Sequence, residues 1–150
     1  MSAQVDLRER LARYAAFFAD LGPGGLDRLG EQFAPGARFK DPFNDVRGIE
    51  QIREVFRHMY ATLDGPRFLI HGFALSGRTG YIHWTLDFVP RGRLRRLRPI
   101  DGLSRVRFDE AGRVAEHVDY WDAAEQVYQR LPLVGALLRL MRSRFSAARR

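Results

Sequence analysis

Three side chains that could perform acid–base chemistry lie far apart in the chain, each within an otherwise apolar stretch: Tyr14, Asp41 and Asp101. Tyr14 lies on a predicted amphipathic helix, Asp41 follows a short strand-like segment, and Asp101 begins a longer one. A fold that brings them together would place one phenol and two carboxyl groups at the bottom of an apolar cup. In such surroundings one carboxyl can act as a base while the other stays protonated and donates a hydrogen bond. These residues therefore favour proton-transfer chemistry.

Each of the three residues also has a purely structural interpretation. Tyr14 could be a core tyrosine of its helix. Asp41, which precedes Pro42, could form an Asx turn. Asp101, which precedes Gly102, could bond its own backbone at a bulge. The joint hypothesis of a site depends on the agreement of the three positions.

Two periodicities divide the chain into elements that must position these residues. Apolar residues at helical spacing predict helices, over residues 5–21, 26–33, 49–63, 124–131 and 133–145. Alternation of apolar and polar residues predicts strands, over residues 37–40, 67–75, 79–89, 97–108 and 114–120. Helices come first and strands follow without βαβ alternation. This order predicts an α+β fold, with a curved antiparallel sheet around the N-terminal helices and an added C-terminal helix.

Length and composition limit the class of protein. A chain of 150 residues, 45% hydrophobic, favours a single domain over residues 1–150, with residues 122–150 as a helical extension. The absence of cysteine excludes disulfides, thiolate metal sites and cysteine nucleophiles. The N-terminus does not resemble a signal peptide, and no apolar run approaches the roughly 20 residues that cross a bilayer. We therefore expect a cytoplasmic protein.

The net charge of +7 comes from arginine, because 24 of the 25 basic residues are Arg and one is Lys40. They are spread along the chain, with denser runs at residues 91–98 and 139–150. A nucleic-acid surface would usually interleave aromatic and basic residues on one face, so we favour solvated arginine-rich faces and expect no nucleic-acid partner. The apolar, arginine-containing segment 133–150 allows weak contact with a membrane surface. We favour instead a helix packed over the domain or onto a partner subunit.

Several short motifs follow one another along residues 8–121. They are Arg13-Tyr14, Leu29 with Phe33-Ala34, Asp41-Pro42, Gly48 with Ile52-Arg53-Glu54, Pro99-Ile100-Asp101, and Phe108-Asp109 with Gly112-Arg113-Val114. Their joint order and spacing resemble the nuclear transport factor 2-like superfamily, particularly its ketosteroid isomerase and SnoaL-like polyketide cyclase branches. The resemblance implies a cone, in which a strongly bent sheet wraps a helix and leaves an apolar pocket open at one end. It also implies a homodimer paired through the outer sheet face.

The resemblance assigns roles to the three polar residues. Tyr14 matches the tyrosine that donates to the substrate oxygen, and Asp41 matches the carboxylate that carries the proton. Asp101 matches the second acid, which stays protonated and completes the oxyanion hole. Chemistry of this kind implies no cofactor.

Strand alternation adds a second polar pair to the implied pocket. If Trp121 points inward, so do His117 and Asp119, where the isomerases place apolar residues. The remaining pocket lining is expected to comprise Phe18, Phe56, Tyr60, Trp84, Leu86, Phe88 and Trp121. Such a pocket favours a ligand that is smaller or more oxygenated than a steroid. In SnoaL-like cyclases and related dehydratases an acid and a histidine in this part of the sheet can transfer the proton, so Asp119 is a second candidate base.

No metal site is expected, because one His–Asp pair offers too few ligands. His71 and His83 lie on predicted strands and are interpreted as structural or surface residues.

Four functions are consistent with this sequence. The first is a cofactor-free enzyme, an isomerase, cyclase or dehydratase, that transfers a proton next to a carbonyl of an apolar ligand. The alternative is a non-catalytic binding or carrier protein for an apolar small molecule. A third is a peripheral membrane protein that acts on a lipid-soluble ligand. Epoxide hydrolysis by an Asp–Arg–Asp set ranks below these, because strand parity places Arg98 outside the pocket.

Overall fold

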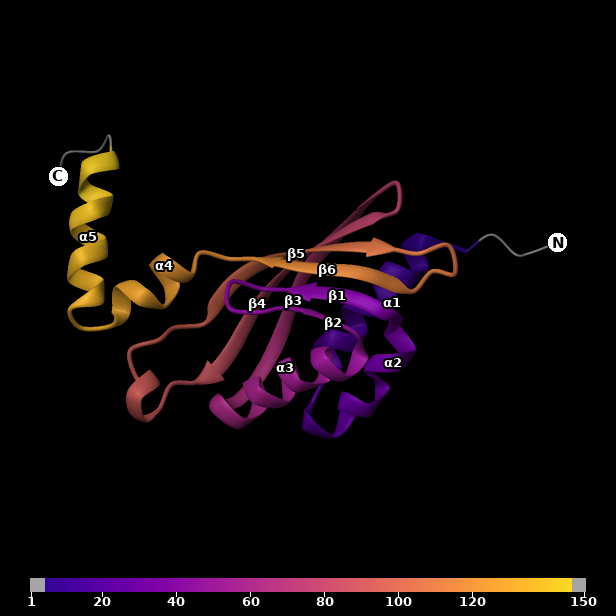
Figure 1. Cartoon of the computed structure of the whole chain (residues 1–150), viewed down its shortest axis with the longest axis horizontal. Helices are drawn as coiled ribbons and strands as arrows, with labels where there is room; N and C mark the ends of the chain where they lie inside the picture. Colours follow the sequence, from indigo (N-terminus) through magenta and orange to yellow (C-terminus); the bar gives the residue numbers. More distant parts are fainter. Residues whose placement is uncertain (1–4, 147–150) are drawn as a thin grey trace.

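The computed structural model describes residues 5–146 of the chain, in which two strands lie between the N-terminal helices, and four further strands precede a helical C-terminal segment (Figure 1). The helices are α1 (Leu7–Asp20), α2 (Leu29–Gln32), α3 (Ile49–Thr62), α4 (Ala123–Gln126) and α5 (Val134–Phe145), with the 3-10 turns η1 (Pro23–Arg28), η2 (Gly92–Leu94) and η3 (Tyr128–Arg130). The strands are β1 (Phe33–Lys40), β2 (Asp45–Arg47), β3 (Asp64–Ser76), β4 (Thr79–Val89), β5 (Ile100–Phe108) and β6 (Val114–Tyr120). The α+β fold class is confirmed.

The strands form one curved, unclosed sheet in the order β2-β1-β6-β5-β4-β3. Figure 1 shows α1, α2 and α3 gathered on one side of this sheet. The pairs β3–β4, β4–β5, β5–β6 and β1–β2 are antiparallel, whereas β1 and β6 run parallel. The predicted antiparallel sheet thus contains one parallel pair. The reason is topological, since β6 returns beside β1 only after three antiparallel turns.

Helix α1 explains where Tyr14 lies. Its N-terminus is capped by Asp6, whose carboxylate accepts from the backbone N–H groups of Arg8 and Glu9. Residues Leu11, Tyr14 and Phe18 lie three and four positions apart, so they share one face of the helix and are buried. Tyr14 is only 1% exposed. The helix therefore places the phenol inside the core of the cone.

Alternation along β5 determines which of its polar residues face the interior. The even-numbered residues Ile100, Gly102 and Ser104 are buried, and the odd-numbered ones between them are exposed. Gly102 pairs with Trp84 on β4, and the Trp84 ring crosses the place where a side chain would be. The interior face of β5 therefore carries Ser104, while Asp101 belongs to the outer face.

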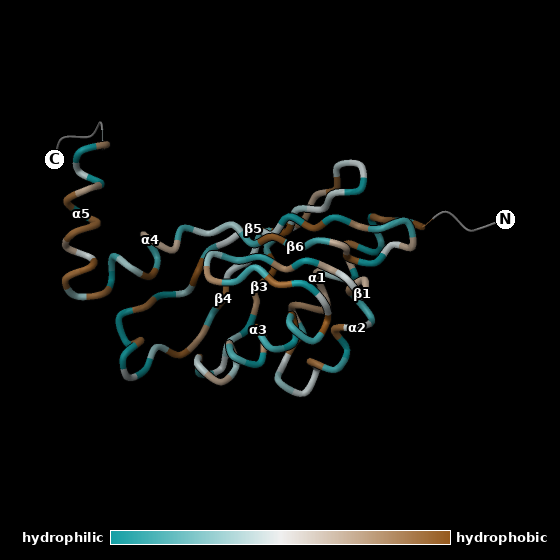
Figure 2. The backbone as a smooth tube through the Cα atoms, in the orientation of Figure 1, coloured by the Kyte–Doolittle hydropathy of each residue, from teal (hydrophilic) through white to brown (hydrophobic). Residues whose placement is uncertain are grey.

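Helix α5 stands apart from the cone, beyond α4 at the C-terminal end of the described chain (Figure 1). Its main packing is against η3, and Figure 2 shows hydrophobic segments along it. The large apolar side chains that it and the residue before it expose are Leu133, Val134, Leu137, Leu140, Met141 and Phe145. The expectation that this helix packs over the domain is wrong, whereas packing onto a partner subunit stays a prediction. Within residues 5–146, no helix is both long and apolar enough to cross a membrane.

Candidate active site

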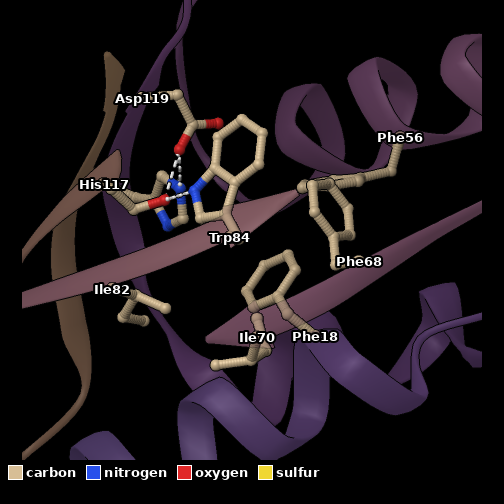
Figure 3. Close-up of a pocket in the computed structure, with 9 residues that line it drawn as sticks. Phe18, Phe56, Phe68, Ile70, Ile82, Trp84, His117 and Asp119 are labelled. Carbon is tan, nitrogen blue, oxygen red and sulfur yellow. Dashed lines mark hydrogen bonds and ion pairs between the residues drawn. The ribbon is translucent and has the colours of Figure 1, made fainter. Parts of the chain in front are cut away.

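A chain of hydrogen bonds links five side chains from α1, β4, β5 and β6 inside the cone. Figure 3 shows the part of it around Trp84, His117 and Asp119. The Tyr14 hydroxyl lies 2.7 Å from Nδ1 of His117, and Nε2 of the same ring lies 2.7 Å from Oδ1 of Asp119. The Ser104 hydroxyl donates to the same Oδ1, and the Trp84 indole N–H donates to the Ser104 oxygen at 2.7 Å. The carboxylate of Asp119 is thus the shared acceptor of the hydrogen bonds from Ser104 and His117.

The chemistry of these groups fixes the direction of the bonds. A carboxylate only accepts hydrogen bonds, so Nε2 of His117 carries the proton that Asp119 receives. In the neutral imidazole, Nδ1 is then the acceptor for the Tyr14 hydroxyl. His117 is 3% exposed and Ser104 is also 3% exposed, so these bonds form away from water, where each missing partner would be costly. The network therefore holds His117 in one tautomer and Asp119 in one orientation.

The Tyr14 phenol is strongly perturbed by its place in the network. Burial raises the pKa of Tyr14 well above its usual value of 10.0, and the negative charge of Asp119 raises it further. The phenol is therefore a hydrogen-bond donor at physiological pH rather than an acid.

Tyr14→Phe should destabilise the fold at neutral pH by about 1–3 kcal/mol, because Nδ1 of His117 loses its donor in the core. The difference from the wild type should shrink as pH rises above about 10. The folded pKa of Tyr14 is raised, so the stability linked to its proton is complete below the unfolded pKa and is lost as pH rises toward the folded one. Denaturant unfolding of both proteins between pH 7 and 11 measures this, and a difference that grows with pH would contradict it.

A cavity of about 300 Å³ opens beside the network. Carbon atoms dominate its wall, to which Asp119 contributes a carboxylate. The residues that line it are Phe39, Asp41, Phe43, Asn44, Val55, Phe56, His58, Met59, Thr62, Leu63, Phe68, Trp84, Leu86, Leu94, Leu97, Ile100, Asp119, Trp121 and Val127. A second, much smaller void of about 20 Å³ lies deeper, against Phe18, Ser104 and His117. The larger cavity has the size and apolar wall of a small-molecule site.

Asp41 lines the same cavity, but its carboxylate is engaged in hydrogen bonds within a turn. Its Oδ1 accepts from the backbone N–H groups of Phe43 and Asn44, both at 2.7 Å, and the Asn44 side-chain amide lies 3.0 Å from each carboxylate oxygen. This is an Asx turn. The structure therefore places Asp41 and Asp119 at one cavity, but it gives Asp41 a structural role that Asp119 lacks.

Two of the predicted roles are corrected by the structure. Asp101 was expected in the oxyanion hole, yet its side chain lies on the exposed outer face, where Oδ1 is 2.8 Å from Nε2 of His83. The cause is strand parity, since its neighbours Ile100 and Gly102 face inward. Tyr14 was expected to donate a hydrogen bond to the substrate. Its hydroxyl is instead hydrogen-bonded to His117, and Tyr14 does not line the cavity.

Only some of the residues predicted to form the apolar lining contact the large cavity. Phe56, Trp84, Leu86 and Trp121 line the large cavity. Phe18 lines only the small void, Phe88 is buried in the core, and the Tyr60 hydroxyl donates to the Leu21 carbonyl at 2.8 Å. Burial raises the pKa of Tyr60 as well.

Ser104 was missed by the sequence analysis, although it holds Asp119. The alternation along β5 could have identified it, because Ser104 faces inward with Gly102 and Val106, and the other inward-facing residues of the strand are apolar. A polar residue at a core-facing position of a strand has to find a hydrogen-bond partner.

Gly102→Ala should disturb the network without touching any of its polar groups. A Cβ atom there would lie 2.3 Å from Cη2 of Trp84, so the indole has to move and its bond to Ser104 weakens. We expect a loss of about 1–3 kcal/mol in unfolding free energy and a shift in tryptophan emission. Gly36→Ala, also in a strand but with nothing within 4 Å of the added methyl, is the matched control. Equal stability of the two variants would contradict this packing.

Comparison with known proteins agrees with the fold. A family model described as a SnoaL-like domain matches residues 14–117, which is more than half of the chain. The chain therefore belongs to the SnoaL-like family, and it shares its fold with an NTF2-like protein from Cytophaga hutchinsonii, which is 10% identical over 83% of this chain and 97% of its own, with a TM-score of 0.61. No curated protein sequence matches it.

Solved structures share the fold at low sequence identity. A steroid delta-isomerase from Pseudomonas aeruginosa is 18% identical, with a TM-score of 0.60 and 99% of each chain covered. A protein from Jannaschia sp. CCS1, provisionally assigned as a SnoaL-like polyketide cyclase, is 15% identical over 83% of this chain and 94% of its own, with a TM-score of 0.67. A provisionally assigned isomerase of the SnoaL-like family from Agrobacterium tumefaciens is 20% identical over 79% of this chain and 99% of its own, with a TM-score of 0.61. These likenesses establish the cone.

Proposed function

We propose that the protein is a cofactor-free enzyme that binds an apolar ketone in the large cavity and transfers a proton at the carbon next to the carbonyl. The observation that carries this proposal is the carboxylate of Asp119, held in one orientation by Ser104 and His117 at the wall of an apolar cavity. Isomerisation, cyclisation and dehydration all begin with such a step.

Asp119 is the better of the two candidate bases. Within residues 5–146, the hydrogen bonds to its carboxylate all end on Oδ1, which leaves Oδ2 for a substrate proton. Both oxygens of Asp41, by contrast, are engaged by its own turn. A base that is already oriented avoids part of the entropic cost of reaching the transition state. In the proposed step Oδ2 takes the proton, and the C–H bonding pair becomes the enolate.

The cavity also limits the substrate class. Several of its lining donors are already engaged: the Asn44 amide by Asp41, the Trp84 indole by Ser104, and His58 by Thr62, whose Oγ1 lies 3.4 Å from Nε2. The Trp121 indole N–H, which no hydrogen bond within residues 5–146 engages, is left to contact a ligand oxygen, but a single neutral donor stabilises an enolate only weakly. Tyr14 and Asp101 supply no oxyanion hole. Without strong stabilisation of the enolate oxygen, a carboxylate base needs a carbon that its own substrate has made acidic. We therefore propose ketones whose reacting carbon is conjugated to a second group, such as an aryl ring or another carbonyl.

Deuterium exchange tests this function. The compound 2-tetralone is an apolar ketone with one carbon between the carbonyl and an aromatic ring. Catalytic amounts of protein in D₂O should accelerate the loss of that carbon's proton signal in the NMR spectrum. If the protein binds 2-tetralone without accelerating exchange, the enzyme hypothesis fails for this class, and the alternative of a binding or carrier protein is favoured.

A further inference from the structure

The outer face of the sheet carries a second cluster of polar side chains, separate from the cavity. His71 on β3, His83 on β4 and Asp101 on β5 are all exposed. One donor atom from each lies within 4.8 Å of the other two. None of these side chains takes part in the hydrogen-bond network of the candidate active site.

The two histidines lie on one face of neighbouring strands, beside a β-bulge. The register pairs Ile70 with Trp84 and then Gly72 with His83, so His71 and Gly72 both lie opposite His83. His71 follows the inward-facing Ile70 and His83 precedes the inward-facing Trp84, so both side chains face outward, and their imidazole rings lie with centroids 4.8 Å apart. Gly72 has no atoms within 4 Å of the position where a Cβ would be, so nothing crowds the pair. Strand alternation on β3 and β4 therefore accounts for two histidines on one side of the sheet here.

The third member comes from the next strand. Asp101 pairs with Thr85 across β4 and β5, which places it diagonally beside His83, and its Oδ1 lies 2.8 Å from Nε2 of that ring. Nε2 of His71 lies 2.7 Å from the Thr85 hydroxyl. Three successive strands thus direct two imidazole nitrogens and one carboxylate oxygen toward one point above the sheet.

We propose that His71, His83 and Asp101 form a binding site for a divalent transition-metal ion, with zinc as the best fit. Two neutral imidazoles and one carboxylate are the donor set of borderline metals such as Zn²⁺, whereas Mg²⁺ and Ca²⁺ prefer oxygen ligands alone. The ligands of a tetrahedral ion at about 2.0–2.2 Å are roughly 3.4 Å apart, so the donor atoms have to approach by small side-chain rotations. All three side chains are exposed, and rotation of exposed side chains is fast and inexpensive.

Three protein ligands leave one coordination position for water or another group. The site is exposed on the sheet and distinct from Asp119, so its occupation does not depend on the function proposed above.

Titration of the full-length, untagged chain with ZnCl₂ in an isothermal calorimeter tests the proposal. We expect one ion per chain, no binding of MgCl₂, and an at least 10-fold weaker affinity in His71→Ala, His83→Ala and Asp101→Asn. His58→Ala is the matched control, because His58 is also exposed but lies on α3. Co²⁺ should give a visible absorption band that is lost in the same three variants and kept in His58→Ala.

The proposal is overturned by an absence of zinc binding, by affinity that survives both histidine variants, or by an equal loss in His58→Ala. One ion for every two chains would also overturn it as stated, because the ion would then bridge two molecules. All variants lie on the surface, so a thermal melt without metal should show them folded.

Discussion

Asp119→Asn is expected to lower the rate of proton transfer from an activated ketone by about 10²–10⁴-fold, the usual contribution of a positioned base. The amide keeps the shape of the side chain, and its oxygen still accepts from Ser104 and His117, so the fold should persist. The pKa of Tyr14 should fall, because one cause of its increase is the Asp119 charge, but burial keeps it raised. Exchange rates with 2-tetralone and a tyrosine absorbance titration measure both effects.

Two companion variants make this result specific. Asp20→Asn changes an exposed carboxylate at the end of α1 that does not line the cavity, and it should leave the rate unchanged. Asp41→Asn tests the competing base. Full activity in Asp119→Asn together with inactivity in Asp41→Asn would reject Asp119 and assign the base to the turn.

Met59→Trp is expected to weaken ligand binding by roughly 10-fold or more, because the larger side chain enters the space that a ligand would occupy. Met59 lies on α3 at the wall of the cavity. The added volume goes into an existing cavity rather than a filled core, so the loss of stability should be smaller than for a substitution at a fully packed position. The indole N–H signals of Trp84 and Trp121, both at the cavity, report binding of 2-tetralone by NMR.

Leu137→Trp is the matched control, since it makes a similar change on the exposed face of α5. Unchanged affinity in Met59→Trp would show that ligands bind elsewhere. The two cavity variants also separate the two functions. A carrier would lose binding with Met59→Trp and be unaffected by Asp119→Asn, whereas an enzyme would lose turnover with both.

The strands of the hairpins could be predicted closely from the sequence. Alternation placed β4 and β6 at the bounds that the structure shows, because each strand has one buried and one exposed face. The three-residue strand β2 was missed, since it is too short for any periodicity to appear. The parallel pairing of β1 with β6 was missed because it joins distant segments, and no local pattern records the partner of a strand.

The candidate site was predictable only in part. Sequence reasoning included His117 and Asp119 because they share the parity of Trp121, and the structure places both toward the interior. It erred at Asp101, where the resemblance to isomerases was given more weight than the alternation of Ile100, Gly102 and Ser104. It could not show that Tyr14 bonds to His117, because the two are 103 residues apart and meet only when α1 packs beneath the sheet.

Helix α5 has a thermodynamic consequence of its own. A twelve-residue helix is marginal in water when it lacks tertiary packing, because nucleation costs more entropy than a few turns recover. Since α5 packs mainly on η3 and leaves Leu137 and Phe145 exposed, little in the cone opposes its opening. The helix–coil equilibrium of this segment is therefore linked to the occupation of its apolar face. Whatever covers that face stabilises the helix by mass action, while the cone can stay folded whether the segment is ordered or not.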